Sequence, residues 1–155
     1  MRFEEEVDVE VSAWFMVVFI VMWIANPLTQ ALFLIAPNLH HKLGMTETDA
    51  FKPQFKWFLL EQKAIAIADM TYLVSGIAFV WLALLGNKTA LIFGLYSCAC
   101  YVYFASTFIP SALLLSKHNL SPISRRQLGV YLLYAALFLV FGLYGLFYLW
   151  GLAQT

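Results

Sequence analysis

Charged side chains are scarce in this sequence, and their scarcity argues against a soluble protein. Only 12% of the 155 residues are charged, whereas 63% are hydrophobic. Soluble domains contain about 25% charged and roughly 45–50% apolar residues. A soluble chain of this length could not bury so much apolar surface, because small proteins have a large surface relative to their volume. The net charge of zero also argues against nucleic acid as a partner.

Residues that commonly bind metals or carry redox chemistry are also few. The two cysteines, Cys98 and Cys100, form a C-x-C pair inside an apolar stretch. On a helix their side chains would point about 200° apart, which disfavours a disulfide between them. The three histidines lie outside the apolar segments, where they are poor candidates for haem ligands: His40, His41 and His118. The sequence therefore predicts no metal site and identifies no cofactor.

Catalytic motifs are missing as well. The sequence contains no nucleotide-binding loop, no nucleophile elbow and no zinc motif. We therefore assign no catalytic residue, and we favour a role that is not enzymatic.

What the sequence does contain is four long apolar segments, at residues 11–36, 55–85, 89–116 and 128–152. Each exceeds the ~20 residues that cross a hydrocarbon layer of about 30 Å. Helices are expected because an open strand cannot satisfy its backbone hydrogen bonds in lipid. We predict an all-α, polytopic membrane protein with four transmembrane helices in an up-down antiparallel bundle, forming a single membrane domain over residues 1–155.

Acidic residues precede the first apolar segment. Residues 1–10 contain one arginine and five acidic residues. A secretory signal has basic residues before its apolar core, and a mitochondrial transit peptide is rich in arginine and poor in acids. We therefore expect the first segment to be retained and to span the membrane.

Basic residues are distributed unevenly between the two ends of the predicted bundle. The connections at residues 37–54 and 117–127, with the adjoining boundary, carry six lysines and arginines. The opposite end carries only Arg2 and Lys88. Because cytoplasmic loops are enriched in basic residues, we predict that both connections lie on the cytoplasmic side and both termini on the opposite side.

Asp69 is the polar residue whose predicted position carries the largest free-energy cost of insertion into the membrane. It lies about 14 residues into the second segment, which is roughly 20 Å along a helix and near the middle of a bilayer. A carboxylate there costs on the order of 3 kcal/mol on insertion scales. Asp69 must therefore face the bundle interior, a neighbouring subunit or a water-filled cavity. It either holds helices together through hydrogen bonds or takes part in ligand binding or proton handling.

Other polar residues are predicted in the same half of the bundle, toward the two basic connections. Gln62 shares a helical face with Asp69 because it lies seven residues earlier. This half suggests a vestibule with a cytoplasmic mouth, although hydrogen bonds between helices alone would explain the same pattern. The candidates for binding a ligand or handling a proton are Asp69, Gln62, Asn26, Gln30, Glu61 and Tyr103.

Three functions are compatible with these features. Small size, the lack of catalytic motifs and a 17% aromatic content favour an accessory or structural subunit of a larger membrane complex. Its partners would be membrane lipids and either other membrane proteins or copies of itself. The alternative is a small-molecule or proton-coupled binder or transporter that uses the vestibule around Asp69.

A lipid- or sterol-modifying enzyme is the third function, with Glu61 and Asp69 as acid and base. These two residues would lie about 12 Å apart along the helix, which is far for joint chemistry. The layout of four helices, with a long first loop and an acidic second helix, resembles that of small sterol-isomerase-like four-helix proteins. The residues that support this resemblance are Trp57, Glu61 and Asp69. The first segment lacks the acidic residue expected there, so the likeness is one of topology and implies no site.

Overall fold

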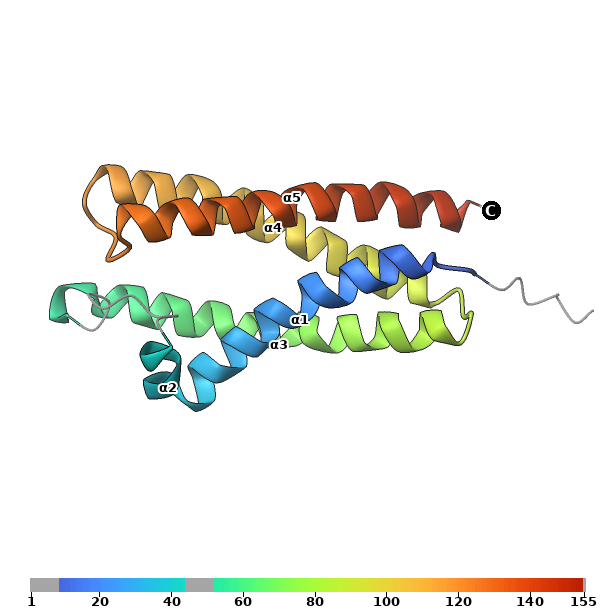
Figure 1. Ribbon diagram of the computed structural model, residues 1–155, viewed down its shortest axis with the longest axis horizontal. Coiled ribbons are helices and arrows are strands. Elements are labelled where there is room, and N and C mark those ends of the chain that lie inside the picture. Colours follow the sequence, from blue (N-terminus) through green and yellow to red (C-terminus); the bar gives the residue numbers. More distant parts are fainter. Residues whose placement is uncertain (1–8, 44–51, 155) are drawn as a thin grey trace, which may run out of the picture.

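Four long helices make up most of the protein in a computed structural model, which describes residues 9–43 and 52–154 (Figure 1). They are α1 (Ala13–Ile35), α3 (Lys56–Leu84), α4 (Ala90–Lys117) and α5 (Arg125–Ala153). By length and composition, each is apolar enough to cross a membrane. The prediction of an all-α four-helix membrane bundle is therefore confirmed. Most of the acidic N-terminal segment and part of the first connection lie outside the described residues.

The first connection contains two short helices that were not predicted. They are α2 (Pro37–Lys42) and the 3₁₀ helix η2 (Pro53–Phe55). Each begins with a proline, whose fixed φ and missing N–H suit the first position of a helix. The chain therefore turns immediately after α1 instead of continuing as an extended loop.

The connection between α4 and α5 is shaped by local hydrogen bonds, and α5 begins three residues before the predicted start. The Ser124 hydroxyl accepts a hydrogen bond from the Gln127 backbone N–H at 3.3 Å, and the Gln127 Oε1 accepts one from the Ser124 backbone N–H at 3.2 Å. This reciprocal pair is a capping box, which starts the helix at Arg125. Before it, Asn119 adopts a φ of 54°, a left-handed conformation that asparagine tolerates better than most residues.

The long helices form two antiparallel pairs, α1 with α3 and α4 with α5, and α3 also packs against α4. Figure 1 shows the pairs close together at the end that holds the C-terminus and separating toward the α1–α3 and α4–α5 connections. At the closed end Phe15 is buried, its ring stacked on Phe141 of α5 with centroids 5.5 Å apart. The Tyr148 hydroxyl also accepts a hydrogen bond from the Ser12 backbone N–H at 2.8 Å. Aromatic side chains therefore link α1 to α5 there.

Gly142 allows α4 and α5 to approach closely. A Cβ atom at this position would lie 2.9 Å from the Cys98 carbonyl oxygen and 2.9 Å from the Val102 Cγ2. A backbone carbonyl cannot rotate away as a flexible side chain can, so the two helices would have to separate. We expect Gly142→Ala to lower the free energy of unfolding by about 1–3 kcal/mol, measured by denaturation in mild detergent.

Gly129 provides the control for this prediction, because it lies on the same helix with no atom near a Cβ built there. Gly129→Ala should be neutral or stabilising by up to about 1 kcal/mol, since alanine is the better helix former. Equal effects of the two substitutions would show that close packing at Gly142 does not matter.

His40, on α2, is buried and its ring contacts Phe33 at a centroid distance of 5.3 Å. Burial lowers the pKa of His40 below its ordinary value of 6.5, because desolvation disfavours the charged imidazolium. The unfolded chain therefore takes up this proton more readily than the folded chain. The contribution of neutral His40 to stability is complete above the unfolded pKa of 6.5 and is lost as the pH falls below it.

We expect the melting temperature in detergent to decrease between about pH 7.5 and about pH 5, and His40→Phe to reduce this decrease. His118→Gln is the control, because His118 is exposed beyond the end of α4. A pH dependence that His40→Phe leaves unchanged would contradict the assignment to His40.

Candidate functional site

A cluster of three polar side chains joins α1 to α3 near the middle of both helices. Asn26 is only 9% exposed, and its Nδ2 donates hydrogen bonds to the Asp69 Oδ2 at 3.2 Å and to the Tyr72 hydroxyl at 3.1 Å. The two hydrogens of the amide match these two acceptors. Asp69 and Tyr72 present one face to Asn26, because they are three residues apart on α3. Two of the predicted candidates, Asn26 and Asp69, therefore lie in contact.

The close approach of α1 to α3 beside this cluster depends on a glycine. The Trp23 indole packs directly against Gly76, where any Cβ atom would overlap it. Trp23 lies three residues before Asn26, and Gly76 lies four residues after Tyr72. Since the helices are antiparallel, contact between Trp23 and Gly76 fixes the register that brings Asn26 to Asp69 and Tyr72.

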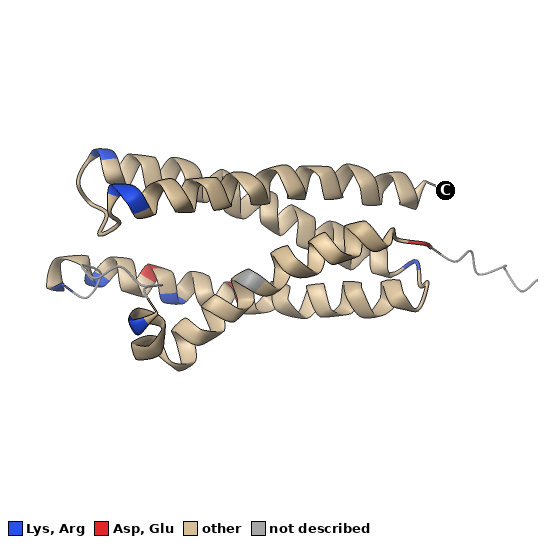
Figure 2. Cartoon of the chain, in the orientation of Figure 1, with Lys and Arg blue, Asp and Glu red and all other residues tan. Residues whose placement is uncertain are grey.

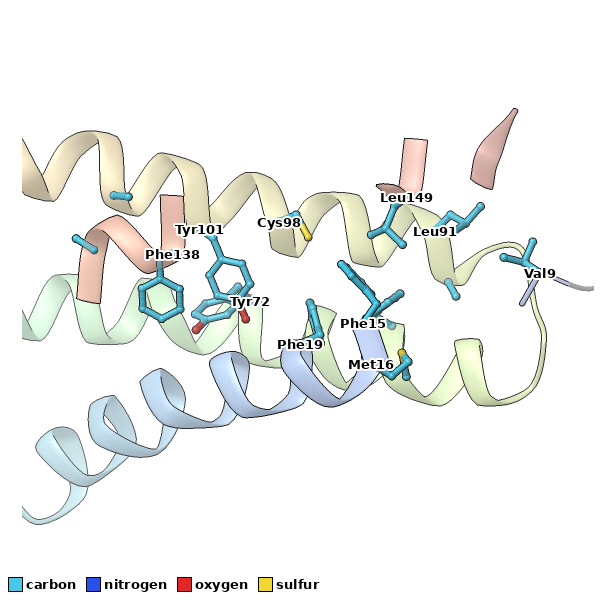
Figure 3. Packing of buried hydrophobic residues seen from close by; sticks show 14 residues of the cluster. Val9, Phe15, Met16, Phe19, Tyr72, Leu91, Cys98, Tyr101, Phe138 and Leu149 are labelled. Carbon is cyan, nitrogen blue, oxygen red and sulfur yellow. The ribbon is translucent and has the colours of Figure 1, made fainter. Parts of the chain in front are cut away.

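Aromatic rings from α4 and α5 cover the other side of Tyr72. Tyr101 is 3% exposed, and its ring meets that of Tyr72 edge to face, with centroids 5.9 Å apart. Tyr101 also stacks on Phe138, with centroids 4.8 Å apart. Figure 3 shows these three rings grouped between α3, α4 and α5. The polar cluster thus has a wall of aromatic side chains.

Two buried donors beside the cluster lack hydrogen-bond partners among the described residues. They are the Tyr101 hydroxyl and the Trp23 Nε1. Leaving a buried polar group unpaired costs about 1–3 kcal/mol, and most such groups in native proteins are paired. Both groups belong to side chains that flank the cluster, whose own amide donors are paired. They distinguish this region from the rest of the described interior.

The remaining predicted candidates lie outside this hydrogen-bonded cluster. Gln30 and Gln62 are half-buried, and Glu61 is exposed. Tyr103 is 72% exposed on the outer face of α4, away from the cluster, and its role in binding a ligand stays a prediction. The residue that faces the interior is Tyr101, which lies two residues earlier and therefore about 200° around the helix.

Tyr72 and Tyr101 are the site residues that the sequence-based prediction missed. Tyr72 lies three residues after Asp69 and thus on a neighbouring part of the same helical face. That spacing was a usable signal. No comparable signal distinguishes Tyr101 from Tyr103, because the apolar residues surround α4 on all sides.

The basic side chains and the side chains that could bind a metal lie mostly away from this cluster or apart from one another. Figure 2 shows lysine and arginine gathered mainly at the end of the molecule that holds the α1–α3 and α4–α5 connections. Over residues 9–43 and 52–154, no group of three histidine, cysteine or acidic side chains is placed to hold a metal ion. Cys98 and Cys100 are free thiols. Among the acidic residues that the structure describes, Asp69 is the one hydrogen-bonded in the cluster with Asn26.

The chain matches no family model, no curated protein and no solved structure. The assignment of a function therefore depends on the arrangement of its own residues.

Proposed function

We propose that this small membrane protein binds a small molecule, carrying a positive charge or a hydrogen-bond donor, at the interior site formed by Asp69, Asn26 and Tyr72. The observation that carries this proposal is that two buried donors without partners among the described residues flank the Asn26–Asp69–Tyr72 cluster: the Tyr101 hydroxyl, whose ring contacts Tyr72, and the Trp23 Nε1, which packs against Gly76. A ligand at this place would offer acceptors to those donors and a cation or a donor to Asp69.

The aromatic rings around the cluster favour an organic cation over a neutral ligand. Positive charge is attracted to the faces of tyrosine and tryptophan rings, by about 0.5–2 kcal/mol depending on desolvation. Tyr72 lies within one helical turn of Asp69, and Trp23 lies within one turn of Asn26. Tyr101, on α4, contacts the Tyr72 ring with centroids 5.9 Å apart. Asp69 would supply the opposite charge, and it is also the group that would carry a proton if binding is coupled to proton movement.

Titration calorimetry of the purified protein with benzylammonium, and with neutral benzyl alcohol for comparison, tests this function. Wild-type protein should bind the cation more tightly than the alcohol, and Asp69→Asn should remove the difference. Equal affinity of the wild type for the two compounds, or an absence of saturable binding to either, would contradict the proposal.

An accessory subunit is the second candidate, favoured by the outward face of α5. Tyr144, Phe147 and Trp150 are exposed and spaced three residues apart, so they form a continuous aromatic row. Large aromatic side chains suit packing against another helix as well as against lipid. A chain that purifies from mild detergent as a monomer, without other membrane proteins, would count against this role.

A further inference from the structure

The connection between α4 and α5 contains a hollow that is separate from the Asp69 site. It has a volume of about 430 Å³. Lys117 is the last residue of α4 and Arg125 the first of α5, so the hollow lies at the ends of two membrane-spanning helices, where lipid headgroups would be. Its lining is mostly polar: Ser116, Lys117, Asn119, Ser121, Ile123 and Arg125.

The hollow is positively charged, and no acidic residue on the neighbouring segments of the sequence balances this charge. Lys117 and Arg125 are the charged residues of its lining. No aspartate or glutamate follows Asp69 in the sequence, so neither α4, the connection nor α5 supplies a carboxylate. The first turn of α5 also begins with two arginines, which is unfavourable beside the positive end of the helix dipole. A bound anion would relieve both sources of repulsion.

The neutral residues of the lining suit the oxygens of a phosphate group. The hydroxyls of Ser116 and Ser121 and the amide of Asn119 can each donate a hydrogen bond. Ser121 Oγ already accepts one from the Ile123 backbone N–H at 3.1 Å, which leaves its own hydrogen to donate. Arginine adds a planar pair of donors that matches two phosphate oxygens.

We propose that this hollow binds a phosphate group, carried by the headgroup of an anionic lipid or free in solution, with Lys117 and Arg125 as its charged contacts. The combination of an open polar hollow, two cations and hydroxyl donors at the membrane surface supports this assignment. The site does not depend on the function proposed for Asp69.

The full chain in mild detergent provides the test, with the melting temperature measured as phosphatidylglycerol, phosphatidylcholine or inorganic phosphate is added. Phosphatidylglycerol should stabilise the wild type more than phosphatidylcholine. The double variant Lys117→Gln, Arg125→Gln should bind it about a hundredfold more weakly, at roughly tenfold for each charge-assisted hydrogen bond that is lost in the hollow. Stabilisation by inorganic phosphate that the same substitutions abolish would assign the site to free phosphate.

Arg126 offers a matched control, because it lies next to Arg125 on α5 and does not line the hollow. Arg126→Gln removes the same charge from the same helical turn and should weaken binding less than twofold. Arg125→Lys keeps the charge and should still lose affinity severalfold, because lysine cannot bind two oxygens as arginine does. Equal losses from Arg125→Gln and Arg126→Gln, or no loss of lipid or phosphate binding in the double variant, would overturn the proposal.

Discussion

Asp69→Asn is expected to weaken the binding of benzylammonium by ten- to a hundredfold while leaving the melting temperature nearly unchanged. An asparagine carbonyl can still accept the hydrogen bond from the Asn26 Nδ2, so the contact between α1 and α3 is kept. The negative charge is lost, and a hydrogen bond to a charged group is worth about 1.5–3 kcal/mol. Calorimetry gives the affinity, and thermal unfolding in the same detergent gives the stability.

Glu61→Gln is the matched control, because it removes the same charge from the same helix at an exposed position. It should leave the affinity for benzylammonium unchanged. If both variants bind as the wild type does, the carboxyl group of Asp69 serves only to hold α1 against α3.

Tyr101→Phe separates a binding role from a packing role most sharply. The hydroxyl has no partner among the residues that the structure describes, so its removal should leave stability unchanged or slightly raised. If it donates to a ligand, binding of 4-methoxybenzylammonium, whose ether oxygen can accept a hydrogen bond, should weaken severalfold, whereas binding of benzylammonium, which has no acceptor, should not change. A loss of stability without a loss of binding would show that this hydroxyl belongs to the core alone.

The helices could be predicted from the sequence because lipid imposes a length and a composition on any segment that spans it. The depth of Asp69 and its approximate level with Asn26 followed from the rise of a helix. What could not be predicted was which face of α4 turns inward, because α4 is apolar on all sides and only the contacts of Tyr101 with Tyr72 and Phe138 decide it. The spacing of apolar residues cannot identify the buried face of a helix when the positions that face lipid and those that face the core are both apolar.

The register between α1 and α3 was also beyond prediction. It depends on the contact of the Trp23 indole with the Gly76 backbone, which links positions far apart in the sequence. Gly76 lies seven residues after Asp69 and so shares its helical face, but nothing in the sequence identifies Trp23 as its partner. The predicted vestibule toward the two basic connections stays a prediction, as does the sidedness of the loops.

Gly76→Val is expected to have the largest effect on stability, because its side chain would occupy the space of the Trp23 indole. The indole would have to leave its site or α1 would have to move away from α3, and overpacking of this kind costs typically 1–3 kcal/mol and occasionally more. We expect a decrease toward the upper end of that range, measured by denaturation in mild detergent. Gly151→Val is the control, since no atom lies near a Cβ at that position.

The contact between Trp23 and Gly76 also predicts a recovery of stability in a double variant and a loss of binding in the single one. Trp23→Leu combined with Gly76→Val should recover part of the lost stability, because residues in contact show non-additive effects. Moving α1 away from α3 also moves Asn26 away from Asp69 and Tyr72, so Gly76→Val alone should weaken benzylammonium binding. The double variant lacks the Trp23 ring and therefore tests the recovery of stability only. If Gly76→Val destabilises the protein but binding stays at the wild-type level, then Asn26 does not position Asp69, and the site is held by α3 and α4 alone.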